Sequence, residues 1–150
     1  MNKQNISLFI VGILWLLSLV GCQKEPINNA IEQHWQLLQF TTLADQKTIQ
    51  CERLYYSITR FVTTVEEKQG THGYGAFVAR TAYSDDNKTL ILSDFKKREN
   101  TGDTGIDATI EQLMPFGINN PKETVFRIVK SSHNQLILES DYARLELKKF

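Results

Sequence analysis

Short alternating segments separated by polar turn clusters constrain the fold of this chain more than any other feature. Near the C-terminus, strand-favouring residues run over 124–130, 135–139 and 142–148, and polar clusters at 131–134 and 140–141 separate them. In the last segment, apolar residues alternate with polar or charged ones, which is the period of a half-buried strand. Because small polar side chains satisfy turn backbone groups, this region predicts consecutive antiparallel hairpins.

The same pattern appears earlier in the chain. Strand-favouring residues occupy four further segments, namely 35–40, 54–65, 74–83 and 89–95. Within 54–65 the alternation changes phase near Arg60, which indicates either a bulge or a break between two strands. Residues 84–88 have the short polar side chains of a hairpin turn, and 48–51 are assigned to an earlier turn. Repeated short strands joined by hairpins indicate an antiparallel sandwich or barrel.

The middle of the chain departs from this pattern. We expect a loop at 100–105 and then a helix over 106–114, because apolar residues recur there at helical spacing. Pro115 and Gly117 end that helix, and its apolar stripe is expected to pack against the sheet. The sequence therefore predicts an all-β domain with one short helix, built as an antiparallel meander.

An apolar leader precedes this domain. Residues 6–20 form a dense apolar stretch after a short start that contains Lys3, which is the pattern of a secretory signal. At about 15 residues, the stretch is shorter than the roughly 20 that a membrane-spanning helix needs. Leu19, Gly21 and Cys22 resemble the lipobox of bacterial lipoproteins. This resemblance implies cleavage before Cys22 and attachment of diacylglycerol, with or without palmitate, to that cysteine.

The chain is thus expected to have three parts. Residues 1–21 are the predicted lipoprotein signal peptide, 22–30 the lipidated cysteine with its tether, and 31–150 the folded domain. A cysteine with two or three acyl chains provides more than the single chain that binds membranes only marginally. We expect an outer-membrane lipoprotein of the cell envelope that faces either the periplasm or the cell surface, with the membrane as its partner through Cys22.

Charge and cysteine content exclude several classes of function. The chain has 17 basic and 17 acidic residues, and loss of 1–21 removes only Lys3, which leaves 16 basic against 17 acidic residues. A nearly neutral domain without a long basic patch argues against nucleic acid as a partner. Cys51 is the one thiol left after lipidation of Cys22, so no internal disulfide can form, and we expect Cys51 to be structural.

No catalytic or metal-binding pattern stands out in the sequence. His34, His72 and His133 are far apart and lack the spacing of metal ligands. No serine lies in a nucleophile-elbow motif. We therefore expect a protein that is not an enzyme and has no metal and no cofactor. A hydrolase would need a pair of carboxylates, or a nucleophile with its base, brought together in a cleft.

The order of elements resembles the small lipocalin-like lipoproteins of the Bacteroidetes, over residues 34–150. In that family a Gly-X-Trp motif opens the first strand, and an arginine of the last strand lies over the tryptophan. Trp35 and Arg144 match by order, although no glycine precedes Trp35. The resemblance implies a barrel of about eight strands closed at one end by Trp35 and Arg144, with a cation–π contact between them. Alternatively, Trp35 is ordinary core and Arg144 an exposed charge.

Aromatic residues on the predicted strands are the candidates for ligand binding: Tyr56, Phe61, Tyr74, Phe77 and Tyr83. An eight-stranded barrel has just enough interior to be filled by side chains or to hold one small ligand. The first hypothesis is a barrel that binds a small apolar or amphipathic ligand. The alternative is a filled barrel that serves as a protein–protein interaction or assembly module of an envelope complex.

Overall fold

The computed structural model describes residues 28–100 and 102–150. The predicted signal peptide and Cys22 lie outside the described residues. Nine strands occur in the described part: β1 (His34–Thr42), β2 (Thr48–Ile58), β3 (Val62–Glu67), β4 (Ala76–Tyr83), β5 (Thr89–Glu99), β6 (Gly102–Asp107), β7 (Glu123–Ser131), β8 (Gln135–Glu139) and β9 (Ala143–Lys149). A short helix α2 (Ile110–Leu113) and a 3₁₀ turn η1 (Met114–Phe116) lie between β6 and β7.

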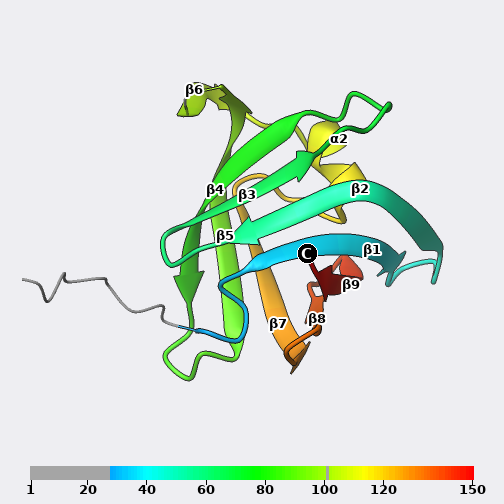
Figure 1. Ribbon diagram of the computed structural model, residues 1–150, viewed down its shortest axis with the longest axis vertical. Helices are drawn as coiled ribbons and strands as arrows, with labels where there is room; N and C mark the ends of the chain where they lie inside the picture. The colour runs from blue at the N-terminus through cyan, green and yellow to red at the C-terminus, as the bar shows by residue number, and fades with distance from the viewer. Residues whose placement is uncertain (1–27, 101) are drawn as a thin grey trace, which may run out of the picture.

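Eight of these strands form a closed antiparallel barrel. The sheet order is β4-β3-β2-β1-β9-β8-β7-β5, and a further pairing between β4 and β5 joins its two edges (Figure 1). Strand β6 pairs only with β5 and stands outside this ring. Closure removes the exposed sheet edges that open sheets must protect. The predicted fold class, an all-β meander closing into a barrel with one short helix, is therefore confirmed.

Alternation along the strands sets the inner and outer faces of the barrel. On β4, Phe77, Ala79 and Thr81 are buried, whereas the alternate residues Arg80 and Ala82 are exposed. Inside the wall, the Thr63 and Thr81 hydroxyls pair at 2.7 Å, so these two buried polar groups satisfy each other. The strands were predicted from a two-residue alternation, and the same alternation determines which side chains fill the barrel.

The barrel has two ends, which we call the N-terminal end and the mouth. The N-terminal end comprises residues 28–33 and the hairpins at 59–61, 84–88 and 132–134; it lies at the lower left of Figure 1. The mouth comprises residues 43–47, 68–75, 108–122 and 140–142 and contains α2 and η1. The phase change near Arg60 is a break between two strands, because the Thr59 amide donates to the Val62 carbonyl across a tight turn.

Three local predictions were wrong. Residues 48–51 belong to β2, because Arg53 adopts a left-handed φ of 57° that lets the strand continue through an irregularity. Residues 102–107 form β6, where a loop and the start of a helix were expected. The helix is limited to Ile110–Leu113, and Leu113 is its one buried residue. Among the described residues, no helix is both long and apolar enough to cross a bilayer.

Candidate functional site

Large side chains occupy the interior of the barrel. The largest fully buried side chains belong to one connected core cluster: Trp35, Tyr56, Phe40, Phe77, Phe95, Phe116, Phe126, Ile31, Leu37, Ile58, Leu90 and Leu92. They come from both ends of the barrel and from the strands between them. Because each aromatic side chain of this kind buries about 150–250 Å², such a cluster fills an eight-stranded barrel.

Trp35 closes the N-terminal end. Its indole is fully buried, and Nε1 donates to the carbonyl of Ile31 at 2.8 Å. Ile31 is itself buried and precedes β1 by three residues. The segment before the first strand therefore turns under the barrel and satisfies the one polar atom of the indole. Trp35 is therefore a buried core residue at the N-terminal end of the barrel.

Arg144 does not share that role, and the predicted contact between Arg144 and Trp35 is wrong. In the β1–β9 register, Trp35 lies opposite Lys149, whereas Arg144 lies opposite Thr41. The two residues are therefore separated along the strands. The Arg144 side chain is partly exposed, and it donates to Glu139 Oε2 at 3.0 Å. Matching by strand order identified the correct strand but not the position along it.

The plug formed by α2 and η1 closes the mouth. The Tyr56 hydroxyl donates to the Phe116 carbonyl at 2.6 Å, and this buried bond joins residues 60 apart in sequence. The Phe116 ring meets Phe77 edge-on, with 6.0 Å between the ring centroids. Thr109 caps α2 through a reciprocal bond pattern with Gln112, which fixes the start of this short helix. The plug is therefore tied to the barrel wall from within.

Gly117 ends the plug where a larger residue would not fit. It adopts φ 76°, a left-handed conformation that glycine adopts without strain. A Cβ at this position would lie 3.1 Å from Leu145 Cδ1 and 3.2 Å from Phe40 Cγ. The chain therefore passes directly over the core at Gly117 as it leaves η1.

A hollow of about 260 Å³ lies beside the plug at the mouth. Its lining comes from β2, the 68–75 loop and η1, and it includes both apolar and polar residues. These residues are Ile49, Gln50, Cys51, Glu52, Leu54, His72, Tyr74 and Pro115. Ile49, Cys51 and Tyr74 also pack against the core cluster. The hollow is thus open to solvent on one side and bounded by the barrel core on the other.

Glu67 holds the polar wall of this hollow in place. Its carboxylate accepts hydrogen bonds from the Tyr74 amide at 2.9 Å and from the His72 amide at 3.1 Å. The Glu67 side chain is only 4% exposed, and His72 Nδ1 lies 2.8 Å from its Oε1. Burial raises the pKa of Glu67, but these hydrogen bonds from Tyr74 and His72 outweigh burial and lower that pKa overall. The His72 ring stacks on Tyr74 with 4.8 Å between the ring centroids.

Cys51 has the character of a packing residue. Burial raises the pKa of its thiol to about 11, so the reactive thiolate is scarce at neutral pH. Its sulfur lies 3.8 Å from the carbonyl oxygen of Ile49. Within the described residues, no group of three or more His, Cys, Asp or Glu side chains is placed to hold a metal ion.

The five predicted ligand-binding aromatics do not form one site. Tyr56 and Phe77 are buried in the core, and Tyr74 lines the mouth hollow. Phe61 lies at the tip of the β2–β3 hairpin and is exposed. Tyr83 lies at the N-terminal end of the barrel, where burial and then the nearby Glu32 carboxylate raise the pKa of its hydroxyl. The barrel therefore separates residues that sequence reasoning had grouped by type.

Sequence reasoning missed two apolar members of the hollow. Ile49 falls in the segment that was assigned to a turn, and Pro115 was assigned only the role of ending a helix. The alternation of Ile49 and Cys51 was the available signal, because both side chains face the core side of β2.

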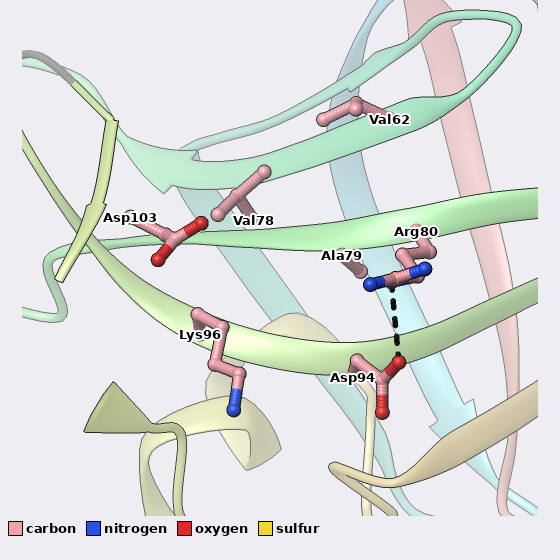
Figure 2. A pocket seen from close by; sticks show the side chains of 7 residues that line it. All are labelled: Val62, Val78, Ala79, Arg80, Asp94, Lys96 and Asp103. Atoms are coloured by element: carbon pink, nitrogen blue, oxygen red, sulfur yellow. Dashed lines mark ion pairs between the residues drawn. The ribbon is translucent and has the colours of Figure 1, made fainter. Parts of the chain in front are cut away.

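Another hollow, of about 350 Å³, lies on the outer wall of β4 and β5 (Figure 2). Its charged residues are largely paired: Arg80 Nε lies 3.3 Å from Asp94 Oδ2, and Lys96 binds Asp107. Figure 2 shows Arg80 paired with Asp94, and Lys96 farther along the strand that carries Asp94. Val62, Val78 and Ala79 also line this groove, but its exposed ion pairs remain hydrated and it lies on the outer wall, away from the plug. The mouth hollow is the stronger candidate site.

An eight-stranded up-and-down barrel with its strands in chain order is the architecture of lipocalin-like proteins. The sequence profile of the lipocalin-like domain matches residues 16–150, and the chain belongs to this family. Proteins of this fold are usually not enzymes. No curated protein matches the chain.

Two solved structures share the fold. An uncharacterised protein from Bacteroides eggerthii is 13% identical, with a TM-score of 0.59 over 79% of this chain and 98% of its own. A lipocalin-like protein from Bacteroides uniformis is 17% identical, with a TM-score of 0.56 over 81% of this chain and 99% of its own. At these identities the likeness establishes the fold.

Proposed function

We propose that this protein is a lipid-anchored lipoprotein of the outer membrane that binds a small amphipathic molecule at the barrel mouth without catalysing a reaction. The observation that carries the proposal is the mouth hollow, which joins apolar walls to polar groups. Ile49, Tyr74 and Pro115 offer apolar surface, and His72 and Glu52 offer polar groups at the rim. Small-molecule sites combine these features.

The filled interior favours a ligand site at the mouth over one in the centre of the barrel. Trp35, Tyr56 and Phe126 occupy the space that a central ligand would need. At about 260 Å³, the mouth hollow is below the roughly 300 Å³ at which drug-sized pockets begin. We therefore infer a small ligand with a short acyl or ring-shaped apolar part and one polar group.

Probe binding tests the mouth site. We expect purified protein to enhance the fluorescence of anilinonaphthalene sulfonate, and a medium-chain fatty acid to displace this probe. Ile49→Phe places a larger side chain in the hollow and should therefore weaken probe binding. We expect a loss of about tenfold or more in affinity, which corresponds to about 1.4 kcal/mol of binding free energy. Ile91→Phe is the matched control, because Ile91 is also partly buried but lies opposite Val125 on the outer wall. Equal binding by both variants would contradict the proposal.

Metabolic labelling tests the anchor. We expect radiolabelled palmitate to be incorporated into the wild-type chain and lost in Cys22→Ser, because Cys22 is the proposed acylation site. Mass spectrometry of the mature protein should show that residues 1–21 are absent. Unlabelled protein that retains Met1 would refute the anchor without bearing on the mouth hollow.

The filled interior also favours a second candidate function, that of a protein–protein interaction or assembly module. The outer wall carries an apolar row across three strands, since Ala82 lies opposite Ile91 and Ile91 opposite Val125. Val125 is 46% exposed. Photocrosslinkers placed at Val125 in cells should capture an envelope protein if this function is correct, whereas placement at Ile49 should not.

A further inference from the structure

We propose that the N-terminal end of the barrel docks directly on the surface of an anionic lipid bilayer, with Phe61 at the centre of the contact. This inference rests on the proposed acylation of Cys22 and adds a second, non-covalent contact with the same membrane. It also assigns an orientation in which the mouth hollow faces away from the bilayer.

The length of chain between the anchor and the barrel restricts the distance to the membrane. Six residue steps separate Cys22 from Asn28, the first described residue. Whatever its conformation, a chain of that length spans at most about 21 Å. Strand β2, with 11 residues, is itself about 35 Å long. The short tether therefore keeps the end that contains Asn28 near the lipid.

The hairpins at this end are packed beside the start of the described chain. The Ile58 amide donates to the Gln33 carbonyl at 3.0 Å, which joins the β2–β3 hairpin to the segment before β1. Asn28 Nδ2 donates to the Asn87 carbonyl at 3.3 Å, which joins the same segment to the β4–β5 hairpin. In Figure 1 these hairpins project from the edge of the barrel where the described chain begins.

Phe61 supplies an apolar group at the tip of one of these hairpins. Its side chain is 55% exposed, although the barrel has an interior in which other phenylalanines are fully buried. The Arg60 guanidinium carbon lies 5.2 Å from the centroid of the Phe61 ring. A phenylalanine beside an arginine suits the boundary between lipid headgroups and acyl chains, where the ring enters the apolar layer and the cation stays with phosphate.

The surrounding charge complements anionic headgroups. Five basic side chains lie at this end: Arg60, Lys88, Lys130, Lys148 and Lys149. Opposing them are Glu32, Asp85 and Asp86. The mouth has no such excess, since Asp45, Glu111 and Asp141 there are matched in number by Lys47, Lys68 and Lys122. Basic residues near a bilayer are attracted to anionic lipid, so the local basic excess at the N-terminal end favours contact at that end.

Three basic residues at this end form a local group. Lys130 Nζ donates to Gln135 Oε1 at 2.7 Å, and Gln135 lies opposite Lys148 in the β8–β9 register. The Lys149 amide bonds to the carbonyl of Asn134 in the adjoining hairpin. Lys130 and Lys148 therefore lie together beside Gln135 at the ends of β7 and β9, and Lys149 follows at the end of β9.

Site-specific tryptophan fluorescence tests this orientation. The lipidated full chain would be reconstituted in vesicles of phosphatidylcholine and phosphatidylglycerol with brominated acyl chains, which quench tryptophan that contacts lipid. Two variants are compared, Phe61→Trp at the N-terminal end and Ile106→Trp on β6 near the mouth, where Ile106 is 60% exposed. We expect quenching several-fold stronger for Phe61→Trp, with a blue-shifted emission. The unsubstituted chain, with Trp35 fully buried, supplies the baseline.

Charge reversal provides a second test. The double substitution Lys148→Glu and Lys149→Glu in the Phe61→Trp background should reduce the quenching, whereas Lys122→Glu near the mouth should leave it unchanged. Protein that floats with the vesicles but shows equal, weak quenching at both tryptophan positions would overturn the docking proposal and leave the anchor intact. Protein that does not float at all would refute the anchor, and quenching at Phe61→Trp on added vesicles would then still support docking.

Discussion

The two ends of the barrel are closed by different means. At the N-terminal end, Trp35 Nε1 bonds to a carbonyl only four residues earlier, so closure is local in the chain. At the mouth, Tyr56 bonds to Phe116, 60 residues away, and the plug lies across strands that are already formed. A local closure forms together with its first strand, whereas a long-range closure depends on the finished barrel. The mouth is therefore the end at which the structure can open with less loss of stability.

Trp35→Ala should have the largest effect and is expected to weaken the whole barrel. The substitution empties a fully buried site and leaves the Ile31 carbonyl without its indole partner. We expect the free energy of unfolding to fall by about 3–5 kcal/mol, as for other buried aromatic truncations. Urea unfolding followed by far-UV circular dichroism measures the loss. A loss below about 1 kcal/mol would show that the N-terminal end is not a closed part of the core.

Gly117→Ala tests the mouth at the backbone level. The variant places a Cβ about 3.1–3.2 Å from Leu145 and Phe40 and holds alanine at φ 76°. The left-handed conformation alone costs about 1–2 kcal/mol, and the close contact adds to it. Amide hydrogen exchange should rise more around 113–118 than in β1, because we expect the plug to open locally before the barrel unfolds. Uniform loss of protection would contradict the difference between the two ends.

The sequence predicted the strands well and the plug poorly, for a physical reason. On β4, alternation alone identified Phe77, Ala79 and Thr81 as one face, because neighbouring strands bury every second residue. Around the plug, helical spacing placed Ile106, Ile110, Leu113 and Met114 on one apolar stripe, yet only Leu113 is buried and the other three are exposed. An apolar period shows which residues share a face but not whether another element covers that face.

The candidate site was hidden for a related reason. The hollow brings β2 together with Tyr74 and Pro115, which are distant in sequence, and no local pattern reports that contact. Arg53 adds a left-handed residue within β2, so Cys51 and Leu54 line the same hollow although three positions separate them. Such an irregularity shifts the alternation by one residue, and the position of the shift is fixed by the partner strand.

Tyr56→Phe removes only the bond that ties the plug to the barrel wall. The ring stays in the core, but the Phe116 carbonyl loses its donor. We expect a loss of about 1–2 kcal/mol in unfolding free energy, since a buried acceptor is left unpaired. Exchange at 113–118 should increase while exchange in β1 stays at its wild-type value. If the variant were as stable as wild type, the bond would not hold the plug.

Glu67→Gln should reveal an acid-sensitive contribution to stability at the mouth. The pKa of Glu67 is lower in the folded protein than in the unfolded chain, so the unfolded chain binds a proton first as pH falls. The contribution of Glu67 is therefore fully present above the unfolded pKa and is lost as pH drops through the folded pKa. The stability difference between wild type and Glu67→Gln should shrink between neutral pH and strongly acidic pH. Chemical unfolding at a series of pH values measures it, and a difference independent of pH would contradict it.

Arg144→Ala should have the smallest effect, because its partly exposed pair with Glu139 contributes about 0.2–1 kcal/mol. This size follows from the register, since Arg144 lies opposite Thr41 and not beside Trp35. A double-mutant cycle of Arg144→Ala with Trp35→Phe should therefore be additive to within about 0.3–0.5 kcal/mol. Trp35→Phe keeps an aromatic ring in the core, so both single variants and the double variant are expected to fold and unfold measurably. A larger coupling would place the guanidinium over the indole after all and would make closure of the N-terminal end long-range, like that of the mouth.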